Sequence, residues 1–109
     1  MLRRVPLRRT GRKADPVTPE TRLFVLRRDG ECVLHKRDPF HVCRDQWGAW
    51  HAPDHLLKLS IEHVKSEPRM GVRAASDPEH LVALCHAANL AVPSKAERSW
   101  MRAYLQEVA

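Results

Sequence analysis

The sequence predicts a small α+β domain in which two antiparallel strands and a helix are flanked by further helices. Two short apolar runs, Leu59 to Val64 and Leu81 to Leu84, have the length of strands, and the turn residues Ser76-Asp77-Pro78 precede the second run. Apolar residues also recur at helical spacing toward Val108. A chain of 109 residues forms one small domain, which buries a modest fraction of its surface and gains stability from a bound metal.

The first 17 residues are strongly basic, and we expect them to form a disordered arm before a domain that spans residues 18–109. Residues 1–15 hold six basic side chains against Asp15 alone, so they carry +5 of the net charge of +6. A basic arm on a nearly neutral body favours binding to nucleic acid, and a solubilising tail is the alternative. The basic residues of the arm are Arg3, Arg4, Arg8, Arg9, Arg12 and Lys13.

Two helices have clear boundary signals. Thr18-Pro19-Glu20 places a capping hydroxyl, a first-turn proline and an acid at the start of the first helix, and Asp29-Gly30 ends it. Leu23 and Phe24 are expected on its apolar side together with Leu26. The second helix starts at the capping box Ser94-Lys95-Ala96-Glu97, and we expect it to close over the core.

The segment between the first helix and the first strand is expected to be irregular. Cys32-Val33-Leu34-His35 reads as a short strand or knuckle, and residues 36–58 are interrupted by proline and glycine. We expect Trp47 and Trp50 to form a small satellite core, with stacking on nucleobases as the alternative. His51 and His55 are expected to be solvated.

Four polar residues fall on the predicted hairpin and the helix after it: Glu62, His63, His80 and Asn89. Phosphodiester hydrolysis needs a base that deprotonates water and a cation that neutralises charge on the phosphate. A neutral imidazole at His63 suits the first task, while the oxygens of Glu62 and Asn89 suit Mg²⁺ or Mn²⁺. Adjacent side chains of a regular strand point to opposite faces, so Glu62 and His63 can share a site only where the strand ends or bulges. A buried, hydrogen-bonded histidine is the alternative for His63.

These motifs resemble those of the HNH nuclease family, of the ββα-metal or His-Me finger type, and in particular the small HNH proteins of phages. The resemblance runs from about Thr18 to Leu105 and implies a domain built around one divalent ion, Mg or Mn, with Ni or Zn as alternatives. It implies an endonuclease that nicks or cuts DNA in phage DNA processing or packaging. Other phage DNA-processing proteins would be partners, and the cytoplasm of a bacterial host would be the location. The motifs are Leu26-Arg27-Arg28-Asp29-Gly30-Glu31-Cys32, Ile61-Glu62-His63-Val64, His80-Leu81-Val82-Ala83-Leu84-Cys85, and Asn89.

The resemblance assigns a role to each polar residue. His63 falls on the general base of the family, and Glu62 falls on the acidic position beside it, which binds the metal in many members. His80 falls on the middle position, usually Asn, which braces the loop that carries the base. Asn89 falls on the last position, usually a metal-binding His. The three positions are therefore His, His and Asn in place of His, Asn and His.

Many members of that family also hold a structural zinc between two Cys-x-x-Cys knuckles. Neither knuckle is complete here, yet Cys32, Cys43 and Cys85 supply three thiols, and zinc takes four N or S ligands. Three cysteines suit a reducing compartment and a metal better than a disulfide framework. Three candidates compete for the fourth ligand, and three buried thiols without zinc are the alternative. The candidates are His35, His41 and His86.

Two further expectations concern partners. Lys65, Arg69 and Arg73 lie between the predicted strands and suit contact with a nucleic-acid backbone, although ordinary surface charge is the alternative. No apolar run approaches the roughly 20 residues of a membrane span, and the basic N-terminus has no apolar signal segment, so we expect no membrane partner and no secretory signal. A non-catalytic, zinc-stapled nucleic-acid-binding module is the alternative function. The sequence does not separate DNA from RNA.

Deleting residues 1–15 is expected to flatten the dependence of DNA affinity on salt concentration, because fewer phosphates are neutralised and fewer counterions released. The measurement is a binding titration of both forms over a range of salt concentrations. An unchanged slope would show that the arm does not touch the DNA backbone.

Overall fold

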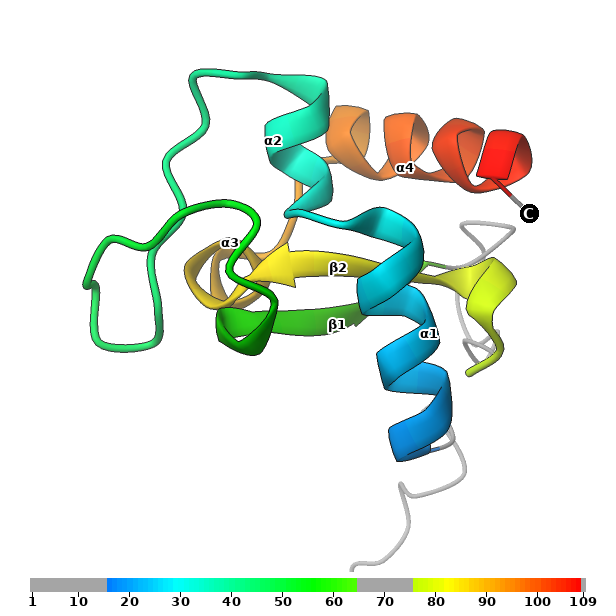
Figure 1. Ribbon diagram of the computed structural model, residues 1–109. Coiled ribbons are helices and arrows are strands. Elements are labelled where there is room, and N and C mark those ends of the chain that lie inside the picture. The colour runs from blue at the N-terminus through cyan, green and yellow to red at the C-terminus, as the bar shows by residue number, and fades with distance from the viewer. Residues whose placement is uncertain (1–15, 65–75, 109) are drawn as a thin grey trace, which may run out of the picture.

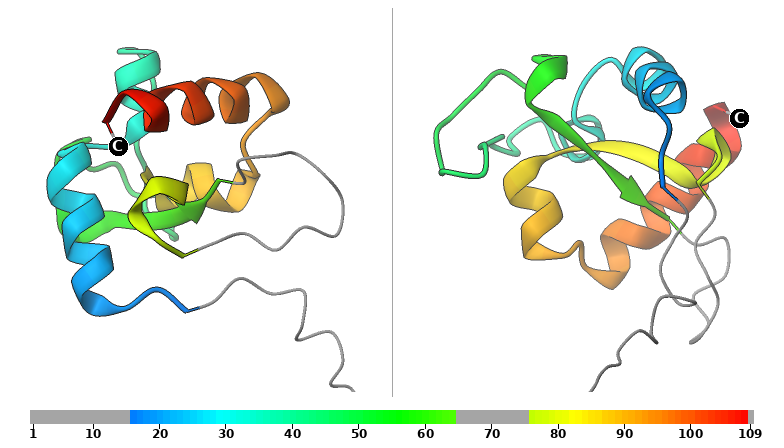
Figure 2. Two further views of the ribbon diagram at one scale, coloured as in Figure 1. Left: turned by 90° about the vertical axis from the view of Figure 1, so that its right-hand side faces the viewer. Right: turned by 90° about the horizontal axis from the view of Figure 1, so that it is seen from below.

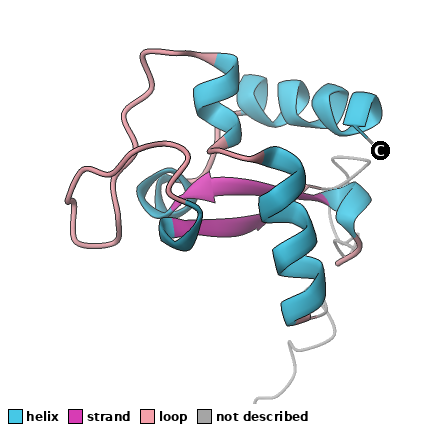
Figure 3. Ribbon diagram, in the orientation of Figure 1, coloured by secondary structure: helices cyan, strands magenta, loops and turns pink. Residues whose placement is uncertain are grey.

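An antiparallel hairpin of two strands, β1 (Leu59–His63) and β2 (Leu81–Cys85), lies at the centre of the computed structural model, which describes residues 16–64 and 76–108 (Figure 1). The register runs without interruption from the pair Leu59 and Cys85 to the pair His63 and Leu81. A long loop joins the helices that precede the hairpin to its first strand (Figure 3). The remaining elements are α1 (Pro19–Asp29), α2 (Val33–Arg37), η2 (Leu56–Lys58), η3 (Pro78–His80), α3 (His86–Ala91) and α4 (Lys95–Val108).

Helices cover the hairpin on both sides, with α1 and α3 on opposite faces (Figure 2, right). All five residues of β2 are therefore buried, although a strand of a two-stranded sheet usually exposes one face. Met101 and Leu105 of α4 complete the core together with Val33 and Leu34 of α2. The expected α+β class, with a hairpin followed directly by a helix, is confirmed.

The ends of α1 and α4 form as their sequences predict. Thr18 accepts a hydrogen bond from the Thr21 N–H at 3.1 Å, and Gly30 ends α1 in the left-handed conformation at φ 72°. At α4 the capping box closes in both directions. Ser94 N–H donates to Glu97 Oε1 at 2.8 Å, and Glu97 N–H donates to Ser94 Oγ at 3.1 Å.

Two local expectations were wrong. Leu23 and Phe24 are 46% and 55% exposed, and α1 instead buries Val25, Leu26 and Asp29 against the hairpin. The segment after Cys32 is the short helix α2 and not a strand, and it packs against α4 and β2.

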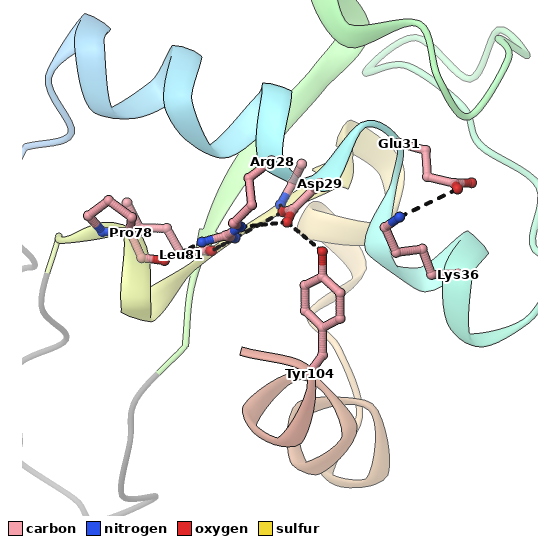
Figure 4. A network of polar contacts seen from close by, with 8 residues as sticks. Arg28, Asp29, Glu31, Lys36, Pro78, Leu81 and Tyr104 are labelled. Atoms are coloured by element: carbon pink, nitrogen blue, oxygen red, sulfur yellow. Dashed lines mark hydrogen bonds and ion pairs between the residues drawn. The ribbon is translucent and has the colours of Figure 1, made fainter. Parts of the chain in front are cut away.

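A buried ion pair at the end of α1 joins the elements around β2 (Figure 4). Arg28 Nε lies 2.8 Å from Asp29 Oδ1, and the Asp29 side chain is fully buried. Its other oxygen, Oδ2, accepts the Ala83 N–H of β2 at 2.9 Å, while Oδ1 accepts the Tyr104 hydroxyl of α4 at 2.6 Å. Burial and the bond to Asp29 raise the pKa of Tyr104, so its hydroxyl keeps its proton and donates at neutral pH.

The guanidinium of Arg28 makes the remaining contacts of this network. Its two terminal nitrogens donate to the Pro78 and Leu81 carbonyls, both at 2.6 Å (Figure 4). Arg28 therefore fixes η3 and the first residue of β2 against α1. None of the helices in residues 16–64 and 76–108 is long and apolar enough to cross a membrane.

Replacing Asp29→Asn is expected to lower the free energy of unfolding by about 3–5 kcal/mol, because it leaves the Arg28 charge half-buried without its partner. Urea denaturation measures the effect. Asp54→Asn at an exposed position is the matched control and is expected to change stability by less than about 0.5 kcal/mol. Equal losses in the two variants would contradict a structural role for the network.

Candidate functional site

Three cysteines and one histidine converge on the side of β2 that faces α2. The Sγ atoms of Cys32, Cys43 and Cys85 and a ring nitrogen of His41 all lie within 4.8 Å of one another. The ligand atoms of a tetrahedral zinc site with Zn–S bonds of about 2.3 Å lie about 3.8 Å apart, so small movements would suffice to bind an ion. The cluster could therefore bind a metal such as zinc.

The four ligands of the cluster come from three local structures. Cys32 caps α2 and Cys85 ends β2, while His41 and Cys43 lie on the loop after α2. The Cys85 N–H donates to Cys32 Sγ at 3.3 Å, and His41 Nε2 lies 3.5 Å from Cys85 Sγ. All three thiols are free and buried, which suits a metal site closed to solvent.

The environment of the cluster favours a thiolate at Cys85. The hydrogen bond from the Cys32 thiol, followed by those from His41 and the backbone of Arg44 and Ala88, lowers the pKa of Cys85 to about 4. Burial raises the pKa of Cys43 to about 11, and the bond to Cys85 raises that of Cys32. One thiolate is thus prepared for a cation, and a bound divalent ion would deprotonate the other two.

Of the three histidines considered as fourth ligand, His41 is the one in the cluster. His35 lies on α2, where its Nδ1 is 2.6 Å from Glu31 Oε1, and His86 starts α3 and lines a separate cavity. The spacing of a Cys-x-x-Cys knuckle favoured His35, which lies three residues after Cys32. That prediction assumed an extended turn in this segment, where the chain instead forms the helix α2. The signal for His41 was its place two residues before Cys43, since alternate residues of an extended segment point to the same side.

His63 is the last residue of β1 and pairs with Leu81, next to the pair of Glu62 and Val82 in the same register. The His63 Nε2 lies 3.1 Å from Ser76 Oγ. Burial raises the pKa of Glu62, and the positive charge of Arg98 on α4 opposes that shift. A partly buried carboxylate of this kind holds its proton more readily unless a cation lies beside it.

Asn89 reaches back from α3 to β1. Its Nδ2 donates to Ser60 Oγ at 3.0 Å and to the Ile61 carbonyl at 3.3 Å. The amide is therefore held against the residue that precedes Glu62 in the chain. With Nδ2 committed to the strand, Oδ1 is the amide atom that can accept a proton donor or a cation.

His80 ends η3, directly before β2. Its Nδ1 pairs with Asp77 Oδ1, and its carbonyl accepts the Val64 N–H at 2.7 Å. The backbone of His80 therefore fixes the residue that follows His63. The side chain of His80 is tied to its own turn and is partly exposed.

The predicted basic contacts lie outside the described residues. This applies to the arm residues within 1–15 and to the loop residues within 65–75, which are Arg3, Arg4, Arg8, Arg9, Arg12, Lys13, Lys65, Arg69 and Arg73.

The expectations for residues 47–51 were wrong. Trp47 and Trp50 form no satellite core, because they are 79% and 67% exposed. His51 is 5% exposed and not solvated, and its backbone N–H donates to the Cys43 carbonyl at 3.1 Å. Its Nδ1 donates to the Ala52 carbonyl, while Nε2 has no hydrogen-bond partner among the described residues.

Comparison of the chain with known protein families, curated proteins and solved structures finds no match.

The purified full-length protein is expected to carry about one zinc ion per chain, bound by three thiolates and His41. Zinc binding at such sites is worth about 10–16 kcal/mol, comparable with the whole stability of a small domain, so chelation should unfold the chain. Metal analysis and circular dichroism before and after chelation test this expectation.

Two histidines on neighbouring segments, His41 and His35, provide the test variant and its matched control for the fourth ligand. His41→Ala is expected to weaken zinc binding by about 100-fold or more, and His35→Ala to leave it unchanged. Equal zinc affinity in the two variants would exclude His41 as a ligand.

Proposed function

We propose that the protein is a metal-dependent endonuclease of the HNH type that nicks DNA by hydrolysing phosphodiester bonds. The observation that carries the proposal is the order and packing of three elements. His63 ends β1, β2 returns antiparallel to it, and the next helix, α3, docks Asn89 on β1 beside Glu62. This supports the ββα arrangement that the motifs around these residues imply.

In the proposed reaction, His63 accepts a proton from the attacking water. Its contact with Ser76 Oγ orients the imidazole at the end of the strand. Glu62 and the Oδ1 of Asn89 are the oxygen ligands for a hard cation, Mg²⁺ or Mn²⁺. Such a cation, when bound, supplies positive charge for the phosphate and the leaving oxygen.

His80 acts in this proposal as a positioning residue. Asp77 holds its side chain, and its carbonyl fixes Val64 next to the base. This is consistent with the bracing role of the middle position of the motif. The Cys32, His41, Cys43 and Cys85 cluster would hold a structural zinc, which would fix the loop after α2 to the end of β2.

A specific observation supports the alternative, a non-catalytic zinc-stapled module that binds nucleic acid. The cysteine cluster offers four ligand atoms suited to zinc, while the hairpin site offers a carboxylate and an amide to its cation. A protein that had lost catalysis would keep the first site and not the second.

His63→Ala is expected to lower the rate of Mg²⁺- or Mn²⁺-dependent plasmid nicking by about 10²–10⁴-fold, because no other group takes the proton from water. DNA affinity should stay within about twofold, since an imidazole at the catalytic position contributes little to backbone binding. Nicking is followed on agarose gels and affinity by fluorescence anisotropy.

His35→Ala is the control, because it removes an imidazole that lies outside both sites. A wild-type protein that binds DNA but never cuts it with Mg²⁺, Mn²⁺ or Ni²⁺ would establish the binding module in place of the enzyme. Equal nicking by wild type and His63→Ala would remove His63 from the mechanism.

A further inference from the structure

A cavity of about 550 Å³ is lined by residues of the loop between α2 and η2 and by Leu59 and Ser60 at the start of β1, the strand that ends at His63. Its size falls in the usual range of ligand sites, about 300–1,000 Å³. Nothing in the proposed reaction uses it. The lining side chains that bear on its chemistry are Arg22, Asp45, Trp47, His55, Lys58 and His86.

Trp47 lines this cavity on a loop whose conformation is fixed by hydrogen bonds. The Asp45 carboxylate accepts the N–H groups of Trp47 and Ala49, both at 2.9 Å, and these bonds help to lower the pKa of Asp45. The Arg44 side chain donates to the Gly48 carbonyl at 2.9 Å, and Gly48 adopts a φ of 86°. These bonds therefore fix the backbone from which the Trp47 indole projects, and 79% of Trp47 is exposed.

The charges around the cavity complement a phosphate. Arg22 Nη2 donates to the Leu59 carbonyl at 2.8 Å, which fixes the guanidinium and leaves other N–H donors for a ligand. Lys58 Nζ lies 3.6 Å from Asp45 Oδ2, while the other oxygen of this carboxylate accepts the N–H groups of the loop. A flat aromatic face beside two fixed cations matches a nucleotide, with its base on Trp47 and its phosphate near Arg22 and Lys58.

The cavity is continuous with the proposed catalytic hairpin. Ser60 lines it and also accepts the hydrogen bond from Asn89 Nδ2. Ser60 and His63 lie three residues apart on β1, so the cavity and the proposed base belong to the same strand.

We propose that this cavity binds one unpaired nucleotide of a DNA strand. The choice of DNA as the ligand rests on the proposed nuclease function. A base inside a duplex is stacked on both sides by its neighbours, so the indole of Trp47 stacks only on a base that has left the stack. The protein therefore prefers DNA with unpaired nucleotides over a continuous duplex.

The test uses full-length, zinc-containing protein without added catalytic ion and measures fluorescence anisotropy of a labelled 20-nucleotide single strand and of its duplex. Trp47→Ala is expected to weaken single-strand binding by about tenfold and to leave duplex binding unchanged. Trp47→Phe keeps a stacking face and should retain most of the affinity. Because only the backbone N–H of Trp47 takes part in the loop bonds, the alanine variant should keep its fold, which its zinc content checks.

Trp50→Ala is the matched control, since Trp50 is 67% exposed on the same loop but does not line the cavity. It is expected to change single-strand affinity by less than about twofold. Equal losses in the two alanine variants, an equal loss of duplex binding by Trp47→Ala, or no loss at all would overturn the proposal. A protein that shows Trp47-dependent single-strand binding but no cleavage would keep this inference and remove the nuclease. DNA cleavage together with unchanged single-strand binding by Trp47→Ala would keep the nuclease and remove this inference.

Discussion

The buried carboxylate of Asp29 is the contact on which the arrangement of the elements around β2 depends. Removing a charge from water costs several kcal/mol, and the cost is offset only when hydrogen bonds and an opposite charge surround it. Asp29 pairs with Arg28 and accepts hydrogen bonds from the Ala83 N–H of β2 and from the Tyr104 hydroxyl of α4 (Figure 4). Because each partner comes from a different element, satisfying one charge fixes three elements at once.

This network and the cysteine cluster hold β2 at its two ends. At the start, Arg28 binds the Pro78 and Leu81 carbonyls and so fixes the turn that carries His80, whose own carbonyl holds the residue after His63. At the end, Cys85 belongs to the cluster that also includes Cys43 of the long loop. The backbone beside the proposed base is therefore fixed through main-chain carbonyls, two of which are bound by the Arg28 side chain.

Local signals predicted much of this structure, and the failures have one physical cause. The capping residues of α1 and α4, the hairpin and the three thiols follow from short patterns that act within a few residues of the chain. The burial of Asp29 could not be predicted from such short patterns. The residue looked like a helix stop, because its partners Ala83 and Tyr104 lie 54 and 75 residues away. Spacing alone also left the fourth ligand open, because it did not show that His35 on a short helix contacts Glu31 while His41 lies with the thiols.

The long loop connects the two sites physically. Cys43 is bound into the cluster, and Arg44, the next residue, forms a bridge with Trp50 that closes the loop presenting Trp47. The His51 N–H donates to the Cys43 carbonyl on the return path. A metal held at Cys43 would thus stabilise both ends of the Trp47 loop, although it would take no part in binding a base. Because an exposed indole is useful for stacking only when its loop is ordered beforehand, a structural ion and a nucleotide cavity are best understood as parts of one binding surface.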